Sequence, residues 1–410
     1  MMKGRTLAEL TVAALIVVGA ATPASAMVAT VRCGPTQGGG EYPSITAALN
    51  AAKAQSPRDH WIYVWGNCTE TVHMWQLDYV RIIGQGGATL SYPPAPPPGS
   101  PLLSLNDTRG TVIQSLTIIG RADMTVDLVR IFYSTTIDFT NVAIRGSGGS
   151  GVFVNQGSTV HFRACVIEGH ASEGVAVSGG SNVTFGENSD PGPNATVVQD
   201  NGSTGIHASQ NSRVALAGDV LVLNNGYTGV AAEASTIFTC CTTGERRISG
   251  NHGSGIAVVG GDFRTTGVVT VENNRGHGFI LAGATAQIGG GGGALIIRNN
   301  DFSGVMVSRN SMVDLYATRI EYNKAFGVMA IDNSTAWTFN STIQSNGAGG
   351  VAAYSLSVAI IFGGNTITNN GGADLFCTPD SGGRGTLDGV GRILCPGFNK
   401  YPTPDPGPPK

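Results

Sequence analysis

The chain has 410 residues, 60 of them glycine, and a formal net charge of −3 at pH 7. Charged residues make up 12% of it, against about 25% in typical soluble domains. A weakly acidic chain lacks the basic field that attracts nucleic acid, and so much glycine indicates a fold with many turns.

Residues 1–26 have the pattern of a secretory signal peptide. Lys3 and Arg5 form a basic start, residues 10–21 an apolar run, and Ala24-Ser25-Ala26 a cleavage site of small residues. No later apolar stretch is long enough to span a membrane. The sequence therefore predicts a protein that is cleaved near Ala26 and secreted or periplasmic, without membrane insertion.

A short helix is expected in residues 27–60, which we interpret as an N-terminal cap. Ser44 can cap this helix, and Pro57 stands beyond its end. Its apolar positions are Ile45, Ala48, Leu49 and Ala52. Strands are expected to follow at residues 61–65 and 80–83.

A pair made of glycine and an apolar residue then recurs nine times, at intervals of 23 to 31 residues. The glycines are Gly151, Gly174, Gly205, Gly229, Gly255, Gly278, Gly304, Gly327 and Gly350. A period of this length is typical of a solenoid, in which each repeat buries its apolar face only against its neighbours. We expect the helix near the N-terminus to cover one end of that solenoid.

Two series of polar residues recur at fixed offsets from these glycines. Four residues before the glycine stands asparagine, at Asn201, Asn225, Asn251, Asn274, Asn300, Asn323, Asn346 and finally Asn370. Seven residues after it stands a small polar residue, at Ser158, Ser181, Ser212, Thr236, Asp262, Thr285, Ser311, Ser334 and Ser357. Stacked asparagines bond from rung to rung, so we interpret both series as structural turn ladders.

Short runs with alternating apolar residues lie between these turns, and no helical pattern of useful length occurs after residue 56. The predicted fold is an all-β, right-handed, single-stranded parallel β-helix over residues 61–376. Residues 377–398 would cap its C-terminal end, and the proline-rich residues 399–410 are expected to be disordered.

Three segments near the N-terminus carry a family resemblance, namely residues 42–52 (YPSITAALNAA), 62–72 (IYVWGNCTETV) and 80–86 (VRIIGQG). The first is similar to the entry helix of the pectin-lyase-like superfamily, and the other two resemble the segments that follow that helix. The likeness implies a parallel β-helix that acts on extracellular polysaccharide. By this analogy alone, calcium is a candidate cofactor.

The catalytic motifs of that superfamily do not carry over. The glutamine-rich run and paired aspartates of pectin methylesterases are missing. Gly276-His277-Gly278 matches the Gly-His-Gly motif of polygalacturonases, but the aspartates and the Arg-Ile-Lys motif of that family are missing. Because the tripeptide includes the repeat glycine and follows Asn274 closely, we interpret it as part of a turn.

Three rungs are longer than the others, with extra residues near 186–194, 240–245 and 289–293. All three insertions fall at the same corner, and insertions on one face of a solenoid often build its binding surface. The strand after that corner has outward charged residues, at Arg247, Glu272, Arg298, Arg319 and Glu321. The next turn adds His252, Arg275, Asp301 and Lys324.

Two interpretations of these charges remain open. Opposite charges on neighbouring strands can form a solvated salt-bridge ladder without function. Alternatively, Glu272, Arg298 and Glu321 are catalytic residues of a polysaccharide lyase or glycoside hydrolase, with Arg247, His252, Arg275, Arg319 and Lys324 binding substrate. Arginine suits the carboxylates of acidic sugars, and carboxylates two rungs apart would lie about 9–10 Å from each other, near the upper limit for inverting glycosidases.

The functional hypotheses follow from these interpretations. One is an exported protein that binds and cleaves polysaccharide, and the other is a non-catalytic surface or binding protein built on a rigid rod. A second polar group, His161, Arg163, Glu168, His170 and Glu173, is interpreted as a solvated face. No oligomeric state and no metal site is assigned.

The seven cysteines would meet an oxidising compartment after export. We predict disulfides Cys33–Cys68 and Cys377–Cys395, one at each end of the solenoid. Cys165 is expected to be a buried, inward residue, and Cys240 to point inward as well. Cys241 has no assigned partner. A vicinal bond to Cys240, a free thiol and an intermolecular bridge are the open alternatives.

Overall fold

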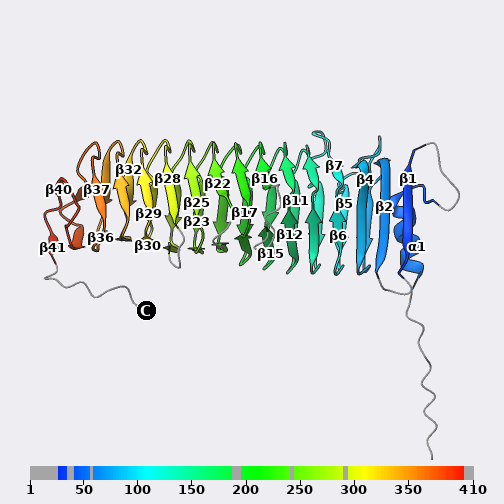
Figure 1. Ribbon diagram of the computed structural model, residues 1–410, viewed down its shortest axis with the longest axis horizontal. Helices are drawn as coiled ribbons and strands as arrows, with labels where there is room; N and C mark the ends of the chain where they lie inside the picture. Colours follow the sequence, from blue (N-terminus) through cyan, green and yellow to red (C-terminus); the bar gives the residue numbers. More distant parts are fainter. Residues whose placement is uncertain are drawn as a thin grey trace, which may run out of the picture.

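The computed structural model describes residues 26–34, 41–55, 59–186, 195–240, 244–289 and 294–400. The expected signal peptide and the expected disordered tail beyond residue 400 lie outside these ranges, as do most residues of the three insertions. In the described ranges the chain is a parallel β-helix of about 13 turns. Figure 1 shows the turns stacked along one axis, with the single helix at the N-terminal end.

Each complete turn contributes three strands, which form three stacks. The first stack is a fourteen-stranded parallel sheet. Its strands are β3 (Val72–Trp75), β5 (Leu103–Asn106), β8 (Val129–Phe132), β11 (Val152–Asn155), β14 (Val175–Val177), β17 (Ile206–Ser209), β20 (Val230–Glu233), β23 (Ile256–Val259), β26 (Phe279–Ala282), β29 (Val305–Ser308), β32 (Phe326–Ala330), β35 (Gly349–Ala353), β38 (Leu375–Cys377) and β40 (Ile393–Leu394).

The second and third stacks belong to one larger sheet, which begins with β1 (Val28–Cys33), β2 (His60–Thr69) and β4 (Val80–Ser91). The second stack consists of β6 (Val112–Gln114), β9 (Ile137–Thr140), β12 (Thr159–Arg163), β15 (Asn182–Phe185), β18 (Arg213–Leu216), β21 (Thr236–Thr239), β24 (Asp262–Thr265), β27 (Thr285–Ile288), β30 (Met312–Tyr316), β33 (Thr335–Phe339), β36 (Val358–Ile361), β39 (Gly382–Gly385) and β41 (Phe398–Lys400). The third stack consists of β7 (Thr117–Ile119), β10 (Ala143–Arg145), β13 (Val166–Glu168), β16 (Thr196–Gln199), β19 (Val220–Leu223), β22 (Arg246–Ser249), β25 (Val269–Glu272), β28 (Leu295–Arg298), β31 (Arg319–Glu321), β34 (Thr342–Gln344) and β37 (Thr366–Thr368).

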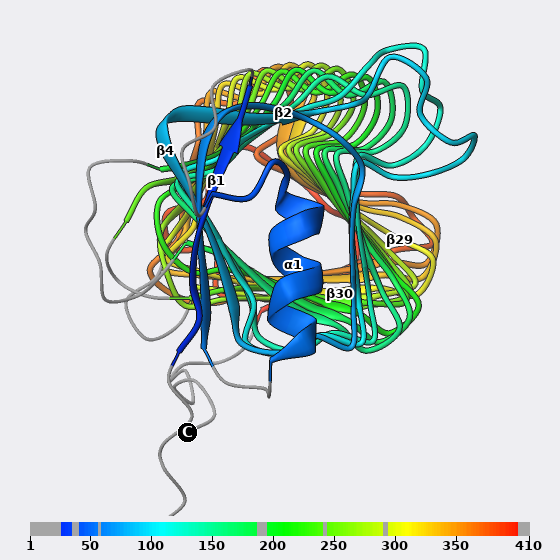
Figure 2. The same ribbon diagram turned by 90° about the vertical axis from the view of Figure 1, so that its right-hand side faces the viewer.

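The predicted entry helix is present as α1 (Ile45–Ala54). The hydroxyl of Ser44 accepts a hydrogen bond from the backbone N–H of Ala47 at 3.0 Å, as an N-cap should. The buried positions are Ile45, Ala48, Leu49 and Ala52, as expected. Figure 2 shows α1 lying across the open end of the coil. The buried residues of α1 belong to the same hydrophobic core as apolar side chains of the first turns.

The asparagine ladder is confirmed, and it explains the repeated glycine. From Asn201 onward each side-chain Nδ2 donates to the Oδ1 of the next asparagine, for example from Asn300 to Asn323 at 2.9 Å. At Gly304 a Cβ atom would lie 2.4 Å from Ile320 Cγ2 and 2.9 Å from Asn323 Nδ2. The glycine is therefore needed because the backbone lies directly against the ladder of the next turn.

The serine ladder differs from its prediction in three rungs. Thr236, Asp262 and Thr285 pair with one another as first residues of β21, β24 and β27. The ladder position falls one residue earlier, and Ser212 N donates to Ser235 Oγ at 3.1 Å. The turn spans residues 309–311 before β30 but only 234–235 before β21, so a constant offset from the glycine fails there.

Both predicted disulfides are present, with Cα–Cα distances of 5.0 Å for Cys33–Cys68 and 4.4 Å for Cys377–Cys395. Cys165 is buried and free, and burial raises the pKa of its thiol to about 11. Cys240 follows β21 in a partly buried position and is disulfide-bonded, which excludes a free thiol there. Cys241 lies outside the described residues.

Candidate functional site

Three of the predicted charged residues, Glu272, Arg298 and Glu321, lie in one column on the third stack, which we call the charged column. It consists of residues at equivalent positions of successive strands, and the register places Glu272 beside Arg298 and Arg298 beside Glu321. Arg247 and Arg319 flank this column, because they lie two residues earlier on their strands. The expected alignment over three adjacent turns is thus confirmed. The strand residues predicted to point inward, among them Val271, Ile297 and Ile320, are fully buried.

Glu272 lies between two arginines. Its Oε1 is 2.6 Å from Arg247 Nη2, and its Oε2 is 2.7 Å from Arg298 Nε. The glutamate side chain is 5% exposed, whereas the arginine side chains are 43% and 42% exposed. Both carboxylate oxygens are therefore engaged below a surface formed by guanidinium groups.

Glu321, two turns further on, is buried beside one arginine and one glutamine. Its Oε2 accepts hydrogen bonds from Arg319 Nε at 2.8 Å and from Gln344 Nε2 at 3.3 Å. Its side chain is 2% exposed, against 54% for Arg319. The sequence indicated outward positions for both glutamates, and the strand alternation agrees. The glutamates are nevertheless buried because neighbouring arginine and glutamine side chains fold over them. The salt bridges of the first interpretation are present, but Glu272 and Glu321 are not solvated in them.

The turn residues form a second, parallel column, because each directly follows an asparagine of the ladder. The backbone N–H groups of His252, Arg275 and Lys324 donate to carbonyls of the preceding turn's ladder asparagines. Lys324 Nζ lies 2.7 Å from Asp301 Oδ1 in an exposed ion pair. His252 and Arg275 are exposed. The two columns together present more cationic than anionic groups to solvent.

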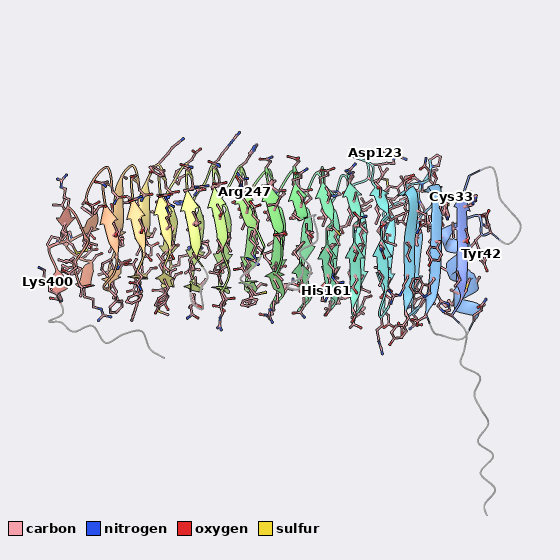
Figure 3. All side chains as sticks on the ribbon, viewed as in Figure 1. Cys33, Tyr42, Asp123, His161, Arg247 and Lys400 are labelled. Carbon is pink, nitrogen blue, oxygen red and sulfur yellow. A yellow bond between two sulfur atoms is a disulfide. The ribbon has the colours of Figure 1, made fainter. Side chains whose placement is uncertain are left out.

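The charged column is longer than the sequence analysis indicated. Arg145, Glu168 and Gln199 occupy the same position three to five turns nearer the N-terminus. Arg145 Nε lies 2.9 Å from Glu168 Oε1, and Gln199 Nε2 donates to Glu168 Oε2 at 2.7 Å. The sequence did not reveal this alignment, because Gly174 and Gly205 are 31 residues apart and the other repeat glycines are 23 to 26 residues apart. Arg247, which flanks the column, lies near the middle of the rod in Figure 3.

His277, the histidine of the Gly-His-Gly tripeptide, lies in a turn. Its Nδ1 accepts a hydrogen bond from Ser303 N at 3.2 Å, and its ring contacts Phe302 at a centroid distance of 5.3 Å. Burial lowers the pKa of His277 from its usual value. These contacts are those of a turn residue between two rungs, in agreement with the interpretation from the sequence.

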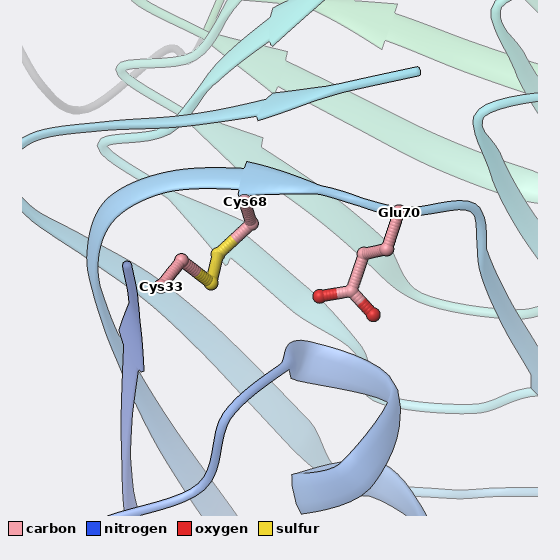
Figure 4. A group of neighbouring side chains, drawn as sticks. All are labelled: Cys33, Cys68 and Glu70. Atoms are coloured by element: carbon pink, nitrogen blue, oxygen red, sulfur yellow. A yellow bond between two sulfur atoms is a disulfide. The ribbon is translucent and has the colours of Figure 1, made fainter. Parts of the chain in front are cut away.

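One group in the described ranges has the proximity of metal ligands, namely Cys33, Cys68 and Glu70 (Figure 4). The two cysteines are joined in a disulfide and so offer no thiolate. Glu70 accepts hydrogen bonds from Ile45 N at 2.7 Å and Thr46 N at 3.0 Å. The carboxylate thus satisfies the free N–H groups at the start of α1 and ties the cap to the coil.

The family model described as "Right handed beta helix region" matches residues 102–190 and 194–367, more than half of the chain. The chain belongs to this right-handed β-helix family. A search of curated protein sequences finds no match. In the described part of the chain, no helix has the length and hydropathy needed to cross a bilayer.

Several solved structures have the same fold at low sequence identity. The A-module of mannuronan C-5 epimerase AlgE6 from Azotobacter vinelandii is 15% identical, with a TM-score of 0.45 over 87% of this chain and 93% of that one. A double mutant of the periplasmic alginate epimerase AlgG is 13% identical, with a TM-score of 0.44 over 83% and 77%. PfbA, a surface adhesin of Streptococcus pneumoniae, is 11% identical, with a TM-score of 0.38 over 85% and 91%.

Proposed function

We propose that the protein is an exported, non-catalytic β-helix that binds an acidic polysaccharide along the charged column. The observation that carries this proposal is the pairing of Glu272 with Arg247 and Arg298. A general acid or base must reach the proton that it transfers, and a carboxylate that is 5% exposed with both oxygens bound to arginine is poorly placed to do so.

The same contacts make the arginines suitable for binding anions. In Arg298 and Arg319 the Nε atom contacts the glutamate. Within the described residues their terminal amino groups have no side-chain partner, so these groups can form two parallel hydrogen bonds to a sugar carboxylate. The buried glutamates would hold the guanidinium planes in place, and the exposed cations Arg275 and Lys324 would widen the positive surface.

Export is part of the proposal. It is supported by the signal-like residues 1–26 and by the two end disulfides, which persist in oxidising compartments. Cell fractionation and N-terminal sequencing should find a mature protein beginning at Met27 outside the cytoplasm. A cytoplasmic protein with residues 1–26 intact would contradict this part.

Binding is tested by calorimetric titration of the purified protein with polygalacturonate and alginate, and with dextran as the neutral polymer. Binding to the acidic polymers should weaken as salt is added. Arg247→Ala, Arg298→Ala and Arg319→Ala should each reduce affinity about two- to fivefold, because an exposed ion pair contributes up to about 1 kcal/mol. Arg264→Ala is the matched control, since Arg264 also pairs through Nε with an aspartate but lies on β24 of the second stack.

The enzyme hypothesis is tested on the same polymers, with and without calcium, by absorbance of unsaturated products and by release of reducing ends. We expect no turnover. Turnover that Glu272→Gln or Glu321→Gln abolishes would overturn the non-catalytic assignment. Equal affinity of the wild type and all three arginine variants would overturn the binding site.

A further inference from the structure

A cavity of about 360 Å³ lies at the corner between the first and second stacks in the N-terminal turns. Its walls come from the turns after β3, β5 and β8, in the blue and cyan part of Figure 1. Its volume falls within the range of small-molecule sites, about 300–1,000 Å³. The charged column belongs to the third stack, so the cavity is a separate feature.

The cavity lies at the longest of the described turns between the first and second stacks. The connection spans residues 107–111 after β5, against 133–136 after β8, 178–181 after β14 and 234–235 after β20. Backbone hydrogen bonds hold this turn to its neighbour, such as Tyr79 N to Arg109 O at 2.7 Å. The backbone around the cavity is therefore fixed by hydrogen bonds between rungs.

The cavity is lined by polar groups, some of which are not engaged elsewhere. Gln76 Nε2 donates to Asp107 Oδ2 at 3.1 Å, which orients that carboxylate. Asp78 and Arg109 also line the cavity. In the described ranges neither has a side-chain hydrogen bond or ion pair, although the two groups carry opposite charges. Their hydrogen-bonding capacity is available to a ligand.

Tyr133 adds flat apolar surface to the cavity and is 59% exposed. Tyr79, next to Asp78, is 44% exposed. The Tyr79 ring lies against Gly110, where a Cβ atom would come within 2.7 Å of the ring. Gly110 thus leaves room for the ring beside the cavity.

We propose that this cavity binds an uncharged pyranose unit of a glycan. Aspartate oxygens accept hydrogen bonds from sugar hydroxyls, the Arg109 guanidinium donates to hydroxyl or ring oxygens, and a tyrosine ring packs on the apolar face of the sugar. Two carboxylates against one guanidinium disfavour a sugar acid. The site therefore selects an uncharged ligand, unlike the acidic polymer proposed for the charged column.

The test is saturation-transfer NMR of the purified protein with glucose, galactose, mannose, cellobiose and lactose, each at millimolar concentration. At least one should bind, and Asp78→Asn and Tyr133→Ala should weaken it at least tenfold. The matched controls are Asp332→Asn and Tyr227→Ala, because Asp332 is an exposed turn aspartate and Tyr227 a turn tyrosine that is 64% exposed. Both should retain the wild-type affinity.

Three outcomes would overturn the inference. One is that none of the five sugars binds, and another is that binding survives both cavity variants. The third is galacturonate binding that is lost in Tyr133→Ala but kept in Arg298→Ala, because it would place a sugar acid in the cavity. None of these results depends on binding at the charged column, so the two proposals fail separately.

Discussion

His170 and Asn201 occupy successive positions of one hydrogen-bonded ladder, and the backbone N–H of His170 donates to Asn201 Oδ1 at 3.2 Å. The imidazole takes the place of an asparagine carboxamide, because it forms hydrogen bonds at the same position of the ladder. Nδ1 accepts from Ser147 N at 3.2 Å, and Nε2 contacts Ile144 O at 3.1 Å. This pattern requires the neutral ring with its proton on Nε2. The sequence-based interpretation of His170 as part of a solvated face is wrong, because the residue is 2% exposed.

Acid should destabilise the protein through His170, and His170→Asn should remove that effect. Burial lowers the pKa of His170 to about 4. Because the folded pKa lies below the unfolded value, the stabilisation is complete above about pH 6.5 and is lost as pH falls toward 4. The shift corresponds to about 3 kcal/mol. Urea unfolding at pH 7 and pH 4.5 should show a smaller loss of stability in His170→Asn than in the wild type.

The control for this comparison is His161→Asn, at an outward position of β12. It should keep the wild-type difference between the two pH values. An unchanged acid sensitivity in His170→Asn would show that the ladder histidine is not the group responsible.

Gly304→Ala should lower the free energy of unfolding by about 1–3 kcal/mol, the usual cost of forcing an extra methyl into a packed interior. The added Cβ would press on Ile320 and on the Asn323 amide of the next turn. Gly382→Ala is the control, because a Cβ atom there meets nothing within 4 Å. Equal unfolding midpoints for the two variants would contradict the steric explanation of the glycine repeat.

Glu272→Gln should destabilise the fold by about 1–2 kcal/mol, since the change leaves the Arg247 and Arg298 cations without their buried counter-charge. The loss is kept small because both arginines are partly exposed. Glu233→Gln, a change at a glutamate that is 66% exposed, should be neutral. Thermal unfolding of the two variants measures the difference, and a neutral Glu272→Gln would mean that the ion pairs contribute nothing.

The period of the sequence predicted most of the fold, because each turn from Gly174 to Gly350 places its glycine beside the asparagine of the next turn. The Gly304–Asn323 contact shows why both series recur with the same spacing. The burial of Glu272 and Glu321 could not be predicted, since it depends on the directions that long arginine side chains take between turns. The cavity beside Asp78 was missed because its residues come from turns of three rungs that precede the regular repeat.

Asp314 on β30 provides a pH effect of opposite sign. It aligns with Gln287 and Trp337 on the outward face of the second stack, and burial raises the pKa of its carboxyl. Because the folded pKa lies above the unfolded value, the protonated form is favoured in the folded state. The stability that the protonated carboxyl contributes is fully present below the unfolded pKa of about 3.8. It is lost as pH rises through the folded pKa.

Asp314→Asn should therefore be more stable than the wild type at pH 7. This advantage should shrink as pH is lowered toward 4, where the wild-type carboxyl becomes protonated as well. Urea unfolding of both proteins at pH 4 and pH 7 tests this. Other groups titrate equally in the wild type and the variant, so their effect cancels when the two free energies of unfolding are subtracted at each pH. A variant that is equally destabilised at both pH values would instead mean that the charged carboxylate has a favourable partner.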